Sequence, residues 1–297
     1  MSRRIVQLDA APSLPSLYAA AAGGHLARLA GRGRETPGAL PETEHRVAGV
    51  RADPARVVAY QRLMGDTVRD TLPSVFVHGL AFPVAMGLMA ERSFPLPLLG
   101  MVHLANRVDH ARPLAVSGPL EVRAWAEELA PHHAGTRVDL VSEVHNGDGP
   151  AWRGTSTYLA KGVWAGERPE RPARDDAGVA APARTGAWRL GPGTGRDYAA
   201  VLGDYNPIHL SAASARALGL KRQIAHGMYL AGRALASTAP VEGGYRWEIT
   251  FEAPVFLPGT VQFAARPDGG RTGFSGWDGR TGRRHFRGSV EPTVAGA

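Results

Sequence analysis

The sequence predicts an α+β protein built from two related domains in tandem. At 297 residues the chain is long enough for two domains of roughly 130 to 150 residues each. Tyr60–Asp66 aligns with Tyr198–Asp204, and the pair His78-Gly79 then matches His226-Gly227. Because the matches occur in the same order and at similar spacing, they favour an internal duplication over chance similarity.

A polar, proline- and arginine-rich stretch separates the two copies, and this composition is typical of a surface linker. We therefore expect a first domain over residues 1–164, a linker over 165–187 and a second domain over 188–297. The first domain should end in a hairpin of strands near 136–144 and 151–159, since both runs are rich in β-prone residues and an Asn-Gly-Asp-Gly turn lies between them.

The elements of the second domain follow from local signals. Thr194 and Asp197 fit a capping-box-like helix start, and Gly203 is placed to end that helix. Asp204 then opens an irregular loop, in which Pro207 keeps the preceding residue extended. After the loop we expect a short helix over 211–218, a buried helix from Gly227 to Thr238 that Pro240 stops, and a closing meander of strands over 260–265, 272–277 and 284–290.

Composition excludes several classes of protein. The chain has no cysteine, so it has neither disulfides nor cysteine-ligated metal centres. No apolar run approaches the 18 or so residues of a membrane span, and we expect a cytoplasmic protein, with export or anchoring through the segment after Arg3 and Arg4 as the alternative.

The net charge is +7 and the sequence pI about 10.2, but the basic residues are scattered and lysine occurs only at positions 161 and 221. Scattered charge argues against a nucleic-acid partner. The denser arginine cluster at positions 280, 283, 284 and 287 is interpreted as a solvated strand edge, with a site for coenzyme A phosphates or an acidic carrier protein as the alternative.

One motif is specific enough to indicate a family. Gly203-Asp-x-Asn-Pro-Ile-His209, followed by Ile224-Ala-His-Gly-Met228, resembles the signature of the MaoC-like hydratases, the (R)-specific type 2 enoyl-CoA hydratases and 3-hydroxyacyl-thioester dehydratases. The resemblance implies a hotdog fold, in which an antiparallel sheet wraps around a central helix, and here a tandem (double) hotdog. It also implies that Asp204 and His209 are catalytic and that Asn206 positions them or the substrate.

The chemistry of these residue types agrees with the resemblance. Hydration of an enoyl thioester needs a water activated at C3, a proton for C2 and stabilisation of the thioester oxygen. Asp204 and His209 supply a base and an acid, although the sequence leaves open which group makes which transfer. The resemblance assigns the backbone N–H of Gly227 to an oxyanion hole, and a free N–H at the start of a helix suits that role. It implies no metal and no cofactor.

The first copy departs from the motif, because it keeps Asp66 but has Val68 and Thr71 where the second copy has Asn206 and His209. We therefore expect one active site per chain, with Asp66 and His78 as structural residues. Asp109 and His110 are expected at a polar strand edge. Pro83 and Gly87 interrupt the first copy's central helix, which suggests a binding site for an acyl chain, unless Pro83 merely sits in the first turn.

The expected activity is thus reversible hydration of trans-2-enoyl thioesters, or dehydration of (R)-3-hydroxyacyl thioesters, in fatty-acid metabolism. The substrate would be an acyl-CoA or an acyl-carrier-protein thioester, and a homodimer is left open. Two alternatives remain: a hotdog acyl thioesterase, and a non-catalytic subunit that binds acyl thioesters.

Overall fold

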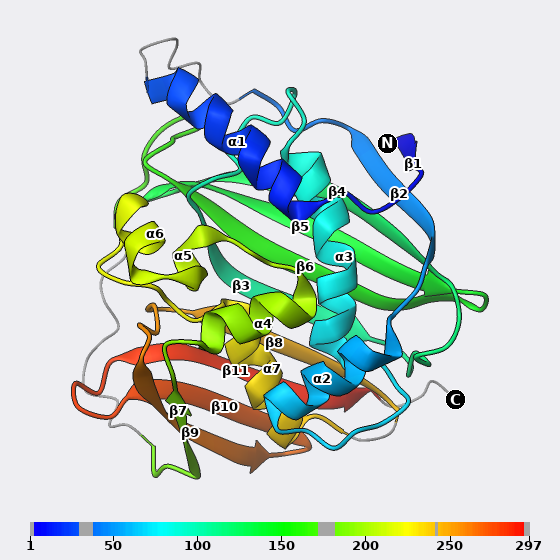
Figure 1. Ribbon diagram of the computed structural model, residues 1–297, viewed down its shortest axis with the longest axis vertical. Helices are drawn as coiled ribbons and strands as arrows, with labels where there is room; N and C mark the ends of the chain where they lie inside the picture. Colours follow the sequence, from blue (N-terminus) through cyan, green and yellow to red (C-terminus); the bar gives the residue numbers. More distant parts are fainter. Residues whose placement is uncertain (1–2, 30–37, 172–181, 241–242, 294–297) are drawn as a thin grey trace.

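The computed structural model describes residues 3–29, 38–171, 182–240 and 243–293. One sheet of eleven strands runs through the molecule, and the helices lie in front of it in the view of Figure 1. In spatial order the strands are β1 (Arg4–Leu8), β2 (Thr43–Val50), β4 (Leu120–His132), β5 (Gly135–Asn146), β6 (Gly149–Lys161), β3 (Met101–His110), β8 (Gly244–Phe251), β11 (Arg284–Thr293), β10 (Arg271–Asp278), β9 (Gly259–Asp268) and β7 (Gly186–Leu190).

The strand order confirms the tandem hotdog architecture. The order β2-β4-β5-β6-β3 of the first half is repeated as β7-β9-β10-β11-β8 in the second, and the pairs within each half are antiparallel. The halves meet where β3 pairs with β8, from Ala105 opposite Thr250 to His110 opposite Tyr245. The two sheets expected from the sequence are therefore one continuous sheet. The linker and domain bounds stay predictions, and β7 begins within the last two residues of that linker.

Seven helices are described: α1 (Leu14–Leu29), α2 (Pro54–Met64), α3 (Ser74–Met89), α4 (Thr194–Leu202), α5 (Pro207–Leu210), α6 (Ala212–Ala217) and α7 (Gly227–Thr238). The long helices α3 and α7 hold equivalent places in the two halves. Most side chains of α3 are buried, and it packs on β4, β5 and β2. A helix that is apolar on nearly all sides is stable only in such a position.

The packing of α3 and α7 corrects one alignment made from the sequence. Gly79 is the sixth residue of α3, and a Cβ built there would lie 3.0 Å from Leu202 of α4. Gly232 is the sixth residue of α7, and a Cβ built there would overlap Tyr60 of α2 and lie 2.6 Å from Met64, the last residue of that helix. The repeat therefore pairs Gly79 with Gly232, and the match of His78-Gly79 to His226-Gly227 is wrong by five residues. A His-Gly dipeptide is too short to fix a register by itself.

Most local predictions agree with the structure, and two do not. The hairpin of β5 and β6, the meander of β9, β10 and β11, and the left-handed Gly203 after α4 (φ 81°) are confirmed. The capping box is wrong: the N-cap of α4 is Gly193, whose carbonyl accepts from Asp197 N. Asp109 and His110 do not lie at a strand edge either, because β3 is an interior strand and His110 is only 3% exposed.

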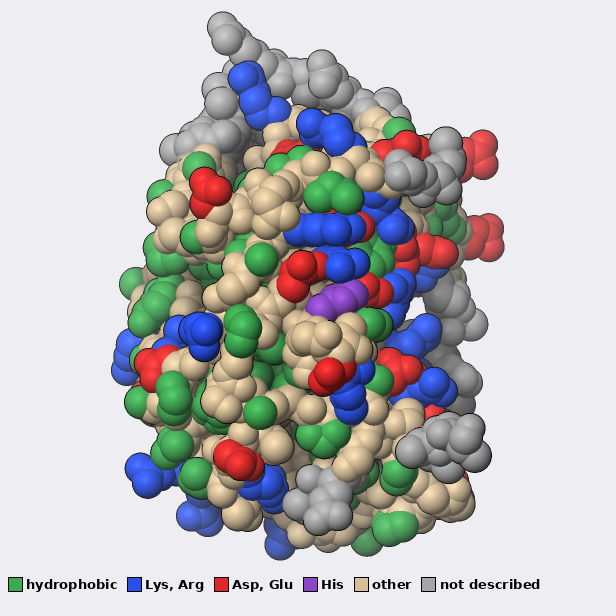
Figure 2. Space-filling view, turned by 90° about the vertical axis from the view of Figure 1, so that its right-hand side faces the viewer, with side chains coloured by type: hydrophobic (Ala, Val, Ile, Leu, Met, Phe, Trp, Pro, Cys, Tyr) green, Lys and Arg blue, Asp and Glu red, His purple; other side chains and the backbone are tan. Residues whose placement is uncertain are grey.

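Charged side chains are interleaved on the face of the molecule shown in Figure 2. Ion pairs form within single strands, as Arg46 with Glu44 in β2 and Arg123 with Glu121 in β4. They also join neighbouring strands, as Arg153 of β6 with Glu143 of β5. This mixture of signs differs from the continuous basic face that tracks a nucleic-acid backbone. In the part of the chain that is described, no helix has the length and apolar character needed to cross a membrane.

Candidate active site

The motif forms a tight loop between α4 and α5. Gly203 turns the chain at the end of α4, and residues 203–206 are irregular. Asn206 is the N-cap of the one-turn helix α5, where its side-chain oxygen accepts from Ile208 N at 3.3 Å, and Pro207 occupies the first helical position. Asn206 and Pro207 thus fix the turn that carries His209 towards Asp204.

His209 is a buried, neutral imidazole with a defined tautomer. Its Nδ1 lies 2.8 Å from the carbonyl oxygen of Ile224, and because a carbonyl can only accept, Nδ1 carries the proton. Burial, with a smaller contribution from the neighbouring His226, lowers the pKa of His209 to about 3. At neutral pH the Nε2 lone pair is therefore free to accept a proton.

His226 packs directly on His209, with ring centroids 3.6 Å apart and an interplanar angle of 29°. Its Nε2 donates to the backbone oxygen of Asp204 at 3.0 Å and lies 3.7 Å from Oδ2 of the same residue. Burial lowers the pKa of His226 to about 3, so this ring is also neutral. His226 thus ties the start of α7 to the Asp204 loop and supports one face of the His209 ring.

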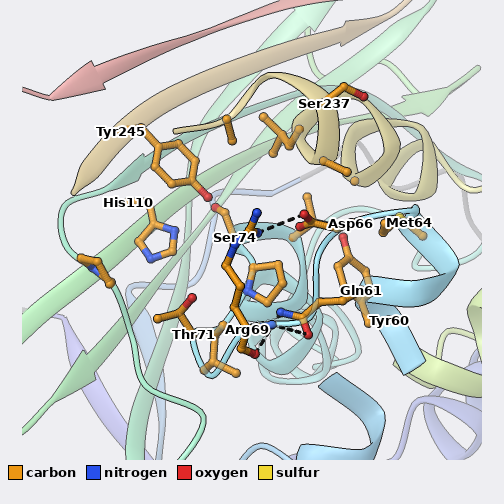
Figure 3. A pocket seen from close by; sticks show the side chains of 18 of the residues that line it. Tyr60, Gln61, Met64, Asp66, Arg69, Thr71, Ser74, His110, Ser237 and Tyr245 are labelled. Carbon is orange, nitrogen blue, oxygen red and sulfur yellow. Dashed lines mark hydrogen bonds and ion pairs between the residues drawn. The ribbon is translucent and has the colours of Figure 1, made fainter. Parts of the chain in front are cut away.

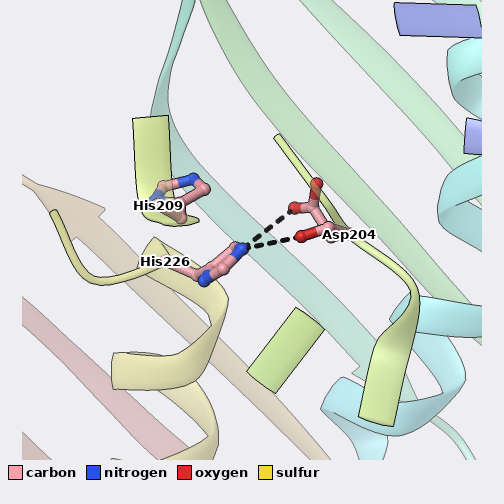
Figure 4. Close-up of side chains that lie close together, drawn as sticks. All are labelled: Asp204, His209 and His226. Atoms are coloured by element: carbon pink, nitrogen blue, oxygen red, sulfur yellow. Dashed lines mark hydrogen bonds and ion pairs between the residues drawn. The ribbon is translucent and has the colours of Figure 1, made fainter. Parts of the chain in front are cut away.

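Asp204 completes the cluster shown in Figure 4. Its Oδ1 accepts from Asn206 N at 3.3 Å and from the hydroxyl of Tyr18 at 3.0 Å, and its side chain is 20% exposed. Atoms of Asp204, His209 and His226 lie within 4.8 Å of one another. One water molecule could bridge two groups at that separation.

The same three side chains could offer ligand atoms to a metal ion. Nδ1 of His209 and Nε2 of His226 each donate to a carbonyl oxygen, so the nitrogens that keep a lone pair are Nε2 of His209 and Nδ1 of His226. The rings also stack rather than converge. The unprotonated Nε2 of His209 is the form that proton transfer requires.

Gly227 is the first residue of α7, and the side chain of its N-cap, His226, makes no capping hydrogen bond. The first N–H groups of the helix are thus left without a side-chain partner at this end. A Cβ at Gly227 would lie 2.9 Å from the Phe251 ring. A side chain at this position would therefore require the Phe251 ring to shift.

The degenerate first copy holds a different arrangement. Asp66 pairs with Arg69 at 3.0 Å and accepts from Thr67 N at 2.7 Å. Asp66, Arg69 and Thr71 line a cavity of about 250 Å³ that lies between α2, the start of α3 and the end of α7 (Figure 3). The carboxylate is thus held in an ion pair, and Thr71 offers no imidazole beside it.

The sequence did not identify two side chains of the cluster. His226 stands in the quoted motif, but only its neighbour Gly227 was given a role. Tyr18 precedes Asp204 by 186 residues, and nothing in its sequence context indicates the contact. The other motif residues, Asp204, Asn206 and His209, come together as the sequence suggested.

The double hotdog and this loop define a MaoC-like protein. Residues 177–287 match the family model described as "MaoC like domain". Over 78% of its length, the chain is also 35% identical to a 3-hydroxyacyl-thioester dehydratase. It belongs to the MaoC-like dehydratase family.

That relative is 3-hydroxyacyl-thioester dehydratase X of Mycobacterium tuberculosis, which is 35% identical over 235 residues, or 78% of this chain and 83% of the relative. A crystal structure of HtdX from the same organism is 30% identical, with a TM-score of 0.73 over 84% of this chain and all of that one. A MaoC-like dehydratase from Phytophthora capsici shares the fold at 20% identity, with a TM-score of 0.68 over 87% of this chain and 97% of that one.

Proposed function

We propose that the chain catalyses reversible hydration of trans-2-enoyl thioesters and dehydration of (R)-3-hydroxyacyl thioesters in fatty-acid metabolism. Asp204 and His209 are the catalytic pair, Asn206 positions them, and Gly227 N–H belongs to the oxyanion hole. The observation that carries the proposal is the tautomer of His209, whose bond to Ile224 O leaves Nε2 as an acceptor beside the Asp204 carboxylate.

The site performs the reaction with one water molecule. The water lies between Asp204 and His209, and its oxygen attacks C3 while one of its protons passes to the pair. The pair returns a proton to C2, and the N–H groups at the start of α7 stabilise the charge on the thioester oxygen. Dehydration reverses each transfer, so atoms and protons balance in both directions.

The substrate is an acyl thioester, carried on coenzyme A or acyl carrier protein. The 3-hydroxyacyl-thioester dehydratase named above supports this class. A cytoplasmic location stays a prediction of the sequence, and a homodimer remains open.

We expect crotonyl-CoA to be hydrated to the (R)-3-hydroxy product. Loss of enoyl absorbance without release of free thiol, followed by chiral analysis, measures this result. Release of thiol would indicate a thioesterase instead, and no change in either signal with crotonyl-CoA and with a longer enoyl-CoA would indicate a non-catalytic subunit. A mainly (S) product would show that water is held on the opposite face of the substrate.

We also propose that the first domain receives the acyl chain. Pro83 is the tenth residue of α3, so it does not sit in the first turn. Proline has no N–H, so the carbonyl of Gly79 loses its helical partner inside a buried helix that nevertheless continues to Met89. Such a break in the hydrogen-bond ladder lets side chains shift around an apolar ligand.

We accordingly expect kcat/KM to rise with chain length above four carbons. Each buried methylene contributes roughly 0.8 kcal/mol before ordering costs, so a few carbons raise specificity by about one to two orders of magnitude. The measurement is kcat/KM for a series of enoyl-CoA substrates in the wild type and in Pro83→Ala. A kcat/KM that does not change with chain length would contradict binding of the acyl chain by the first domain. A kcat/KM that rises with chain length equally in the wild type and in Pro83→Ala would contradict only the role of the proline.

A further inference from the structure

A tyrosine from the N-terminal helix binds the candidate catalytic carboxylate. The hydroxyl of Tyr18, in the second turn of α1, donates to Oδ1 of Asp204 at 3.0 Å. The same oxygen accepts from Asn206 N at 3.3 Å. Two donors therefore hold Oδ1, while Oδ2 lies on the side of His226, 3.7 Å from its Nε2.

The start of α1 and the segment before it fix the position of this hydroxyl. Leu14 is 4% exposed, and Leu17 packs against the main core. Just before the helix, Pro12 lies against Gly87 of α3, where a Cβ would come within 2.9 Å of the Pro12 ring. Gly87, which the sequence singled out as a helix interruption, thus leaves room for the segment that leads into α1.

The hydroxyl acts as a donor. Burial, followed by the charge of Asp204, raises the pKa of Tyr18 well above its ordinary value, so the phenol keeps its proton. The other titratable groups near Asp204 are neutral as well: burial lowers the pKa of His209 and His226 to about 3, and raises the pKa of Tyr158 and Tyr198. A donated hydrogen bond then stabilises the charged form of the carboxylate.

We propose that Tyr18 is a positioning residue of the dehydratase site. It holds Oδ1 of Asp204, so that Oδ2 faces the reacting water together with Nε2 of His209. This inference rests on the proposed function, and it makes the helix before the first hotdog part of the second hotdog's site.

The first test is Tyr18→Phe, which removes the hydroxyl and keeps the ring that packs against the core. We expect kcat for crotonyl-CoA to fall by about tenfold with KM within about twofold, because a hydrogen bond to a charged group is lost. Tyr205→Phe is the matched control, because Tyr205 adjoins Asp204 in sequence but is 43% exposed.

A double-mutant cycle separates positioning from a structural role. If Tyr18 acts through Asp204, then Tyr18→Phe has no further effect on kcat in the Asp204→Asn background. Additive losses would overturn the proposal, and so would a wild-type kcat in folded Tyr18→Phe.

A spectroscopic measurement tests the contact between Tyr18 and Asp204 without depending on activity. The Tyr18 hydroxyl proton, which is donated to the carboxylate, should give a proton NMR signal that Tyr18→Phe abolishes and Tyr205→Phe keeps. If the wild type hydrates neither crotonyl-CoA nor a longer enoyl-CoA, the proposed function fails while this signal still decides whether Tyr18 contacts Asp204. Its absence from the wild-type spectrum would overturn the inference.

Discussion

Asp204→Asn and His209→Ala are each expected to lower the turnover of crotonyl-CoA hydration by at least about a hundredfold, the lower end of the range for a general acid or base. Asp204→Asn keeps an oxygen that can accept from Tyr18 and Asn206, so the loop should retain its shape while the charge is lost. His209→Ala removes the free Nε2 and leaves a space beside the His226 ring.

The measurement is kcat and KM for both variants, with thermal unfolding as the check on folding. Asp66→Asn is the matched control, because Asp66 is the corresponding carboxylate of the first copy and is held by Arg69. Turnover close to wild type in either well-folded site variant would remove that residue from the mechanism. A similar loss in Asp66→Asn would contradict the expectation of one active site per chain.

Gly195→Ala is expected to reduce turnover nearly as much as His209→Ala, although Gly195 lies outside the motif. A Cβ at Gly195 in α4 would overlap the backbone oxygen of His209 and lie 3.3 Å from its Cβ. Backbone atoms cannot swing aside like a flexible side chain, so α5 must shift and carry the imidazole out of place. A displacement of about 1 Å in a catalytic group can cost on the order of a hundredfold in rate.

Gly191→Ala is the control for that substitution, since a Cβ there meets nothing within 4 Å and lies four residues away in the same segment. We expect Gly191→Ala to keep wild-type kcat. A crystal structure of Gly195→Ala would show the shift of α5 directly. Full activity of Gly195→Ala would mean that residues 203–209 can move as a unit without changing how Asp204 and His209 lie relative to each other.

Short-range signals predicted much of this fold. Hairpins and meanders followed from β-prone runs between turn residues, and α7 begins and ends at the predicted residues. Gly203 and Pro207 fixed the loop, because the left-handed conformation and the first helical position suit these two residue types. The N-cap of α4 was predicted one residue too late, because it is Gly193 and not Thr194, and no side chain caps this helix.

The sequence by itself determined the duplication, through the match of Tyr60–Asp66 to Tyr198–Asp204, and the loop that brings Asp204 and His209 together, which depends on residues close along the chain. Only the tertiary structure decided the rest of the site. The β3–β8 pairing, the free nitrogen of His209, the stacking of His226 and the hydroxyl of Tyr18 all depend on contacts between segments distant in sequence. Such contacts are set by how whole elements pack, and the spacing of residues within one segment carries no record of them.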